Sequence, residues 1–214
     1  MKKEDFIKPQ MARRTVMVLL AQVIMGFAVA LLKLVTLGTD PYAAMMLALT
    51  DKTPLNYGTF LVVANCVIFL GEIKFGKKYI GLGTLANWFL LGYMVMFWSW
   101  VFGLIVPETL TAMTVRLPLC IIGIIILGFS LSLYQSADIG SSPYDSIPLM
   151  MRDHLHLPFF ISRVILDAIA VVICLAADGL VGLGTLLIVI GLGPVAGWFN
   201  THFSEKLLTE ASAQ

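Results

Sequence analysis

Charged residues are scarce in this sequence. Asp, Glu, Lys and Arg together make up 13% of its 214 residues, whereas an average soluble domain contains about 25%. Hydrophobic residues make up 59% of the chain, and the mean hydropathy is +0.92. So few charges cannot cover a surface exposed to water, which excludes a soluble globular domain. The composition therefore predicts an integral membrane protein, with the lipid bilayer as its main partner.

An excess of charge of either sign is also lacking. The chain has 14 Lys and Arg residues against 13 Asp and Glu residues, which gives a net charge of +1. Proteins that bind nucleic acid need a basic surface to contact the phosphates. We therefore expect no nucleic-acid partner.

Cysteine is rare, and the motifs of common enzymes are missing. Cys66, Cys120 and Cys174 lie far apart in apolar runs, a spacing that fits neither a metal motif nor a disulfide framework. We interpret them as buried thiols. His154 and His156 have no further ligands near them in the sequence, and no Walker loop, HExxH motif or Ser–His–Asp order is present. We expect no catalytic residues, no metal and no cofactor, and predict that the protein is not an enzyme.

Long apolar runs are what the sequence does contain. A transmembrane helix needs about 20 mainly apolar residues. Six stretches meet or approach that length: residues 15–37, 57–73, 83–106, 117–137, 158–177 and 184–203. The first run exceeds the apolar core of a signal peptide, which has about 7–15 residues, so we interpret it as a retained helix. The sequence predicts an all-α membrane protein with six transmembrane helices.

The segments between these runs are short, and none suggests a separate domain. The predicted organisation is a basic N-terminal segment (1–14), a first three-helix unit (15–106), an outer linker (107–116), a second three-helix unit (117–203) and a C-terminal tail (204–214). Positively charged loops stay on the cytoplasmic side of a membrane. If the N-terminus is inside, the outer loops contain only Lys52 and Arg116 as basic residues. Both termini are therefore predicted to be cytoplasmic.

One motif occurs twice in the chain, 102 residues apart. The stretch LGTDPY (37–42) aligns with IGSSPY (139–144), and seven of 23 positions around these stretches are identical. IGLGTL (80–85) and VGLGTL (181–186) follow in the same order, and we expect their glycines to permit close packing or a tight entry into the third and sixth spans. Because each copy contains three spans, the second copy starts on the opposite side of the membrane. The two halves are therefore predicted to be inverted relative to each other, as in many transporters.

Each copy of the motif predicts a sharp turn followed by a short helix. The glycine permits the turn, an Asp, Thr or Ser side chain caps the helix, and Pro41 or Pro143 fits its first position. About a dozen helical residues reach only halfway across a bilayer, so each short helix either lies in the interface or enters the membrane and is buried by protein. Pro148 is expected to kink or shorten the second helix. The helix starts either simply connect tilted spans or present partial positive charge to a cavity, where they favour an anionic or polar group.

Ionisable side chains within a span are energetically costly and are candidates for function. Arg163 and Asp167 are four residues apart and so share one helix face. The offset of 102 residues pairs Asp167 with Asn65. We predict that Asn65 and Asp167 approach each other near the middle of the membrane, where inverted-repeat transporters bind their substrates. An internal ion pair between Arg163 and Asp167 is the alternative interpretation.

Residues around the two motifs extend this set of candidates. Lys33 and Gln135 both lie five residues before the motif glycine, although Lys33 is long enough to extend to the outer surface instead. Asp145 takes the place of Ala43 in the second copy. The candidate substrate-binding residues are Asp167, Arg163, Asn65, Lys33, Gln135, Tyr42, Tyr144, Ser141, Ser142 and Asp145.

At these motifs the chain resembles the YczE-like family of bacterial membrane proteins, which is grouped with YyaS and YitT. The resemblance rests on G-x-x-P-[YW] after the first span, GLGTL before the third, and a second copy of both, and it covers about residues 26–198. In that family the second motif often reads Pro-Trp-Asp; Pro143, Tyr144 and Asp145 match it with Tyr in place of Trp, whereas Ala43 in the first copy is not acidic. The resemblance implies a multi-span protein of the bacterial cytoplasmic (inner) membrane and no established substrate.

The inverted halves and the polar residues within the spans favour a small permease-like carrier. We expect it to move a small polar or anionic solute by alternating the two halves about a site near the middle of the membrane. Asp167, Arg163 and Asn65 would line that site. The alternative is a non-transporting accessory or substrate-binding subunit of a larger membrane complex, associated with a partner membrane subunit or with a second copy of itself.

Overall fold

The computed structural model describes residues 10–106, 110 and 112–209, which form helices and loops with no strand among them. The elements in chain order are α1 (Met11–Val35), α2 (Pro41–Asp51), α3 (Tyr57–Phe75), η2 (Lys77–Tyr79), α4 (Leu82–Ile105), α5 (Met113–Ala137), α6 (Pro143–Leu155), α7 (Phe159–Ala176), α8 (Leu183–Phe199), η3 (Asn200–Ser204) and α9 (Lys206–Thr209). The predicted all-α class is confirmed for these residues. The predicted N-terminal segment, outer linker and C-terminal tail lie partly outside them.

Five helices are long and apolar enough to cross a membrane, namely α1, α3, α4, α5 and α8 together with η3. Each coincides with a predicted span, although α1 and α5 start four residues earlier than expected. The remaining predicted span, residues 158–177, corresponds to α7, which has 18 residues. Large apolar side chains project from the outer faces, and Val67, Leu70 and Ile190 are 72%, 67% and 67% exposed. An exposed apolar surface of this kind suits contact with lipid.

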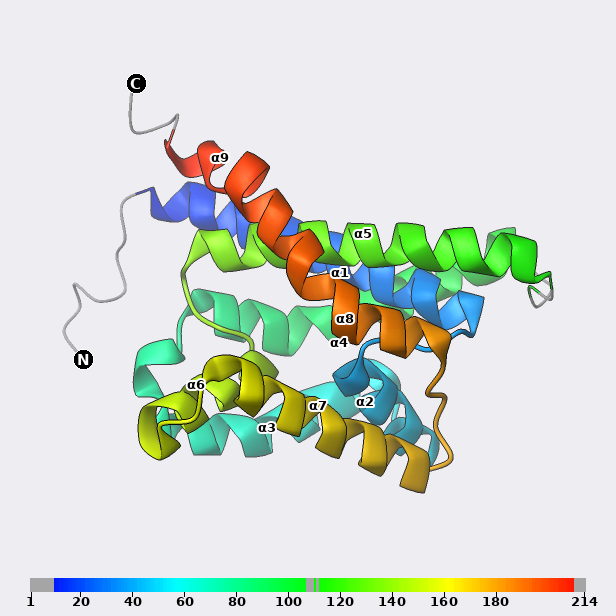
Figure 1. Cartoon of the computed structure of the whole chain (residues 1–214), viewed down its shortest axis with the longest axis horizontal. Helices are drawn as coiled ribbons and strands as arrows, with labels where there is room; N and C mark the ends of the chain where they lie inside the picture. The colour runs from blue at the N-terminus through cyan, green and yellow to red at the C-terminus, as the bar shows by residue number, and fades with distance from the viewer. Residues whose placement is uncertain (1–9, 107–109, 111, 210–214) are drawn as a thin grey trace.

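The centre of the structure is the pair formed by α1 and α5, which lie side by side and run in opposite directions (Figure 1). Two hydrogen bonds join the start of each helix to the end of the other. Arg14 Nη1 donates to the carbonyl of Ala137 at 2.7 Å, and Arg116 Nε donates to the carbonyl of Val35 at 2.8 Å. The helix α4 packs against α1, and α8 packs against α5. Each half of the chain thus contributes one central helix and one helix that covers it.

The helices α2, α3, α6 and α7 form the lower part of the view in Figure 1, where α2 packs against α7 and α6 packs against α3. Both short helices predicted from the repeated motif are therefore present, and each contacts a long helix of the opposite half. In Figure 1, α2 and α6 begin near the centre of the molecule and run outward to opposite ends. The chain enters each of them through a glycine in the left-handed region, with φ of +100° at Gly38 and +122° at Gly140, a conformation that other residues rarely adopt.

The helix α6 runs through Pro148 and has 13 residues, compared with 11 in α2. Of the two effects predicted for Pro148, a kink or a shorter helix, the shortening is therefore wrong. Pro148 is the sixth residue of the helix, so its missing N–H removes the donor to the carbonyl of Tyr144, near the start of α6. The loss of one such bond did not end a helix that is supported by packing on α3 and α7.

The two GLGT stretches hold the halves together at reciprocal positions. The N–H of Gly184 donates to the carbonyl of Leu37 at 2.7 Å, and the N–H of Gly83 donates to the carbonyl of Ile139 at 2.7 Å. Each stretch therefore binds the motif of the other half, not its own. A Cβ atom at Gly182 would lie 2.6 Å from the Leu37 oxygen, and one at Gly83 would lie 2.8 Å from the Gly140 oxygen. The glycines are needed because the two backbones approach so closely.

Candidate functional site

Two tyrosine rings stack where the short helices begin. The centroids of Tyr42 in α2 and Tyr144 in α6 are 4.3 Å apart, and their ring planes differ by 23°. Each ring is the second residue of its helix, after Pro41 or Pro143. The repeated Pro-Tyr motif therefore brings the first turns of the two short helices together from opposite halves of the chain.

Each of these tyrosines donates a hydrogen bond to the long helix that follows it in the same half. The Tyr42 hydroxyl donates to Asn65 Oδ1 at 2.5 Å, and the Tyr144 hydroxyl donates to Asp167 Oδ1 at 2.8 Å. Asn65 is 1% exposed and Asp167 is 9% exposed, so both point into the protein. Asn65 and Asp167 therefore belong to one group, in which the two stacked tyrosines connect them.

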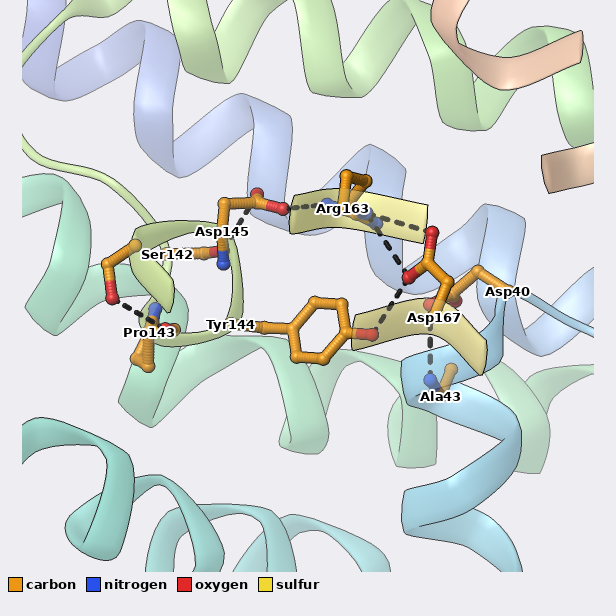
Figure 2. Close-up of polar contacts among 9 residues, drawn as sticks. Asp40, Ala43, Ser142, Pro143, Tyr144, Asp145, Arg163 and Asp167 are labelled. Carbon is orange, nitrogen blue, oxygen red and sulfur yellow. Dashed lines mark hydrogen bonds and ion pairs between the residues drawn. The ribbon is translucent and has the colours of Figure 1, made fainter. Parts of the chain in front are cut away.

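Arg163 joins the second of these pairs to the start of α6. Its Nε lies 3.0 Å from Asp167 Oδ2, its Nη1 forms an ion pair with Asp145, and its guanidinium carbon lies 5.0 Å from the centre of the Tyr144 ring. Figure 2 shows the guanidinium between the two carboxylates, one from α6 and one from α7. The four-residue spacing of Arg163 and Asp167 does form an ion pair, and Asp145 is a second partner that the spacing did not indicate.

Side chains already occupy the N-terminal N–H groups of both short helices. The N–H of Ala43 donates to Asp40 Oδ1 at 3.1 Å, and the N–H of Asp145 donates to Ser142 Oγ at 3.1 Å. Ser142 Oγ also donates to Asp145 Oδ2 at 2.8 Å. These are N-caps of the kind that satisfy free donors at a helix start. They leave fewer N–H groups there for an external anion.

Asp40 belongs to this group, although the sequence indicated it only as a possible cap. Its carboxylate interacts electrostatically with Arg163, Asp167 and Asp145, and Figure 2 shows it beside Asp167. Its acidic side chain at the cap position of the first motif, where the second motif has Ser142, was the available signal. The group therefore contains three carboxylates and one guanidinium.

A cavity of about 730 Å³ leads to the charged side of this group. Its lining includes Met11 and Lys78 toward one end of the molecule, Pro41 at the start of α2, and also Val164 of α7 and Ile190 of α8, which are exposed on the outer faces of these helices. Predicted site residues that line it are Gln135, Ser141, Ser142, Asp145, Arg163 and Asp167. The volume is within the range of small-molecule sites, about 300–1,000 Å³.

Other predicted site residues lie apart from this cavity. Tyr42, Tyr144 and Asn65 are buried and are not among the lining residues. Lys33 is exposed in the last turn of α1, away from the charged group. Its repeat equivalent, Gln135, is also exposed but lines the cavity.

The cysteines do not form a second site. Cys120 and Cys174 are buried, but Cys66 is exposed, so the prediction that all three are buried is wrong for Cys66. Cys66 lies beside Val67 on the outer face of α3, where an apolar run is exposed to lipid instead of the core. Within the described chain, no cluster of three or more His, Cys, Asp or Glu side chains is placed to hold a metal ion.

Ion pairs link each short helix to a neighbouring loop at its outer end. After α2, Lys52 Nζ lies 2.7 Å from Asp178 Oδ2, which follows α7. In α6, Asp153 accepts from Lys78 Nζ at 2.7 Å and from the Tyr79 hydroxyl at 2.5 Å. These two donors hold the pKa of Asp153 at about 2. The free ends of both short helices are therefore fastened at opposite ends of the molecule.

Helices of membrane-spanning length, an apolar exterior and an enclosed polar group define a multi-pass helical membrane protein. Residues 12–201 match a family of unknown function (DUF6198), and the chain belongs to this family. A Haemophilus influenzae protein of uncharacterised role is 28% identical over 87% of this chain and 83% of its own length. The Bacillus subtilis protein YyaS is 29% identical over 72% of the chain and 75% of its own length.

A third relative is the Bacillus subtilis membrane protein YczE, which is 26% identical over 90% of the chain and 87% of its own length. The resemblance to the YczE-like family is thereby confirmed. No solved structure matches the chain.

Proposed function

We propose that the protein is a small secondary carrier of the cytoplasmic membrane, in which α7 also spans the membrane, giving six spans, and the two halves are inverted repeats. The antiparallel central pair α1 and α5, and the reciprocal contacts of the two GLGT stretches, support the inversion. So does the matching of Tyr42 with Asn65 and of Tyr144 with Asp167, since both pairs are separated by 23 residues. Carriers of this type bind substrate near the middle of the membrane, between the repeats.

In this proposal α2 and α6 are re-entrant helices that enter the membrane from opposite sides. Their first turns meet through the Tyr42 and Tyr144 rings, and each runs outward from that contact (Figure 1). Non-helical backbone within the membrane is tolerated where protein or a water-filled cavity surrounds it. The loops before α2 and α6 satisfy that condition, because Leu37 and Ile139 are buried and their carbonyls accept hydrogen bonds from the opposite half.

The observation that carries the proposal is a cavity of about 730 Å³ that leads from one end of the molecule to the ion-paired Arg163 and Asp167. With both termini in the cytoplasm, as the distribution of Lys and Arg favours, this cavity opens inward. The structure then represents an inward-facing conformation. Rupture of the Asp153 contacts at one end and of the Lys52–Asp178 pair at the other would accompany the exchange between inward- and outward-facing forms.

The charges around the cavity favour a solute that carries a positive group. In the group around Arg163, Asp40, Asp145 and Asp167 contribute three carboxylates against one guanidinium. Elsewhere in the cavity lining, Lys78 and Asp138 carry one charge of each sign. Two helix N-termini add about half a positive charge each, which leaves the group acidic, and their N–H groups are already capped by Asp40 and Ser142. Of the polar and anionic solutes expected from the sequence, we therefore favour polar ones with a cationic group.

Transport by purified protein in liposomes tests this proposal. Labelled choline, guanidinium and alanine serve as probes, with sulfate as the anionic comparison. The neutral variant Asp167→Asn is expected to insert and fold, because Arg163 keeps Asp145 as a partner, but to lose uptake of whichever probe the wild type moves. Asp51→Asn, the same change at an exposed position at the end of α2, is the matched control and should keep uptake.

Full uptake by the Asp167→Asn protein would remove Asp167 from the site. If the wild type moves none of the probes and instead co-purifies in fixed proportion with another membrane protein, the accessory-subunit alternative replaces the carrier.

A further inference from the structure

A second acidic side chain is enclosed in the first half of the chain, outside the group around Arg163. Glu72 lies one turn before the end of α3 and is 0% exposed. Neither of its carboxyl oxygens has a hydrogen-bond partner among the described residues. An ionised carboxylate cannot remain buried without such partners, because its lost hydration is not replaced.

The surroundings of Glu72 also disfavour its ionised form. The helices α4 and α6, together with α2 and η2, pack against α3. Among their charged side chains, Lys78 of η2 and Arg152 of α6 pair with Asp153, and in the described chain none forms a hydrogen bond with the Glu72 carboxyl. The Ser146 hydroxyl of α6 is the polar group near the Glu72 carboxyl. Its hydrogen is not available to Glu72, because it donates to the carbonyl of Pro143. The C-terminal end of α3 carries partial negative charge, which repels a carboxylate near the last turn.

Tyr134 of α5 connects this position with the cavity. Its hydroxyl is buried and has no hydrogen-bond partner in the described chain, it interacts electrostatically with both Glu72 and Asp145, and its side chain lines the cavity. A hydroxyl can both donate and accept a hydrogen bond. Tyr134 therefore lines the cavity and is also close enough to the enclosed carboxyl group to interact with it.

We propose that Glu72 is a proton-binding site: it is protonated in the conformation described here and exchanges its proton with the cavity past Tyr134. Resting on the proposed carrier function, this assigns the proton as the coupling ion. Loss of the proton would place an unpaired charge between α3 and α6, so the ionised form favours separation of the two helices. Because α6 carries Tyr144 and Asp145, proton binding and the solute site would be linked through one short helix.

Infrared spectroscopy of the purified protein tests the proton site without any transport assay. The wild type should show the carbonyl stretching band of a protonated carboxylic acid at neutral pH, and the difference spectrum against Glu72→Gln should contain that band. Glu205→Gln, the same change at an exposed position, should leave the band in place. Persistence of the full band in Glu72→Gln would overturn the assignment.

Thermal unfolding gives a second, independent measurement. Gln resembles the protonated Glu side chain in shape and charge, so Glu72→Gln should be about as stable as the wild type at acid pH. As the pH rises, the wild type should lose stability relative to the variant, because unfolding releases a proton that the folded protein retains. A constant difference across the pH range would show that Glu72 does not titrate and would contradict the proposal. Glu72→Asp, which keeps an acid, should restore the pH dependence.

Transport then tests the coupling itself. In liposomes containing a pH-sensitive dye, a gradient of choline or guanidinium should drive proton movement through the wild type. In Glu72→Gln the proton movement should fall to the level of protein-free liposomes, while exchange of labelled for unlabelled solute continues. Unchanged proton movement would refute coupling through Glu72. If the wild type moves no solute, the carrier function fails, and the infrared and unfolding results still decide the proton site.

Discussion

The two halves of the chain share a backbone plan but differ in charge at equivalent positions. Both halves have a positive-φ glycine, a capped short helix and a tyrosine that bonds to the following long helix. The second half has Arg163, Asp145 and Asp167 where the offset of 102 residues places Leu61, Ala43 and Asn65 in the first. Leu61 and Ala43 are buried apolar residues. At these positions the first half therefore forms an apolar core, whereas the second half forms ion pairs.

The difference indicates that the framework and the chemistry of this protein are separable. Contacts that determine backbone position, such as those from Gly184 to Leu37 and from Gly83 to Ile139, occur in both halves. The ion pairs of Arg163 with Asp145 and Asp167 have no counterpart at the equivalent positions of the first half, and the cavity reaches them. The first half also encloses Glu72, whose equivalent in the second half is the buried Cys174.

Removal of Arg163 should have the largest effect on stability, because it abolishes the feature that most distinguishes the halves. Arg163→Gln leaves Asp145 and Asp167 without their shared partner. We expect a loss of about 3 kcal/mol, at the low end of the range for an unpaired buried charge, since 27% of the Arg163 side chain is exposed. Equilibrium unfolding in mild detergent measures this loss.

The matched control is Arg152→Gln, because Arg152 pairs with Asp153 while its side chain is 50% exposed. Its loss should be at most about 1 kcal/mol. Adding Asp167→Asn to Arg163→Gln should recover part of the loss, since one unpaired carboxylate disappears. An Arg163→Gln protein no less stable than Arg152→Gln would show that the charge group contributes nothing to the fold.

Alanine substitutions at the closely packed GLGT glycines should destabilise the two halves equally. Gly182→Ala places a methyl group 2.6 Å from the Leu37 carbonyl oxygen, and Gly81→Ala meets the Ile139 carbonyl in the same manner. We expect each variant to lose about 1–3 kcal/mol, as overpacked sites do, with similar shifts in thermal unfolding. Gly191→Ala is the control in α8, where an added Cβ meets nothing within 4 Å, and it should be neutral or stabilising by up to about 1 kcal/mol. A large effect on one side only would contradict the equivalence.

The sequence was sufficient to predict the helices but not their contacts. Long apolar runs located the spans, and Gly, Pro and a capping side chain located α2 and α6, because these signals act locally along the chain. The stacking of Tyr42 on Tyr144 depends on two segments about a hundred residues apart in sequence, and nothing local encodes it. Arg163 was identified by its cost within a span, whereas its partner Asp145 lies on another helix.

Faces of the long helices were the hardest feature to predict. The helix α3 is apolar on nearly all sides, so its sequence carries no periodic signal of which side is buried. Cys66 was for that reason wrongly assigned to the interior, and Glu72 was not recognised as an enclosed acid. Asp40 was noted only as a cap, because its proximity to Asp167 depends on α2 packing against α7.

The smallest expected effects concern the hydrogen bonds of the two tyrosines. Breaking the bond between Tyr42 and the neutral Asn65 should cost more than breaking the bond between Tyr144 and the charged Asp167. Tyr42→Phe leaves the buried Asn65 Oδ1 without the one hydrogen bond that the described residues provide, which costs about 2 kcal/mol. In Tyr144→Phe, Asp167 keeps both contacts from Arg163 Nε, so about 1 kcal/mol is expected. Both rings and their stacking are preserved, and the two free energies of unfolding can therefore be compared directly. If Tyr144→Phe proved the more damaging, the Tyr144 hydroxyl, and not Arg163, would be the principal partner of Asp167, and the charged half would depend on its tyrosine more than the neutral half does.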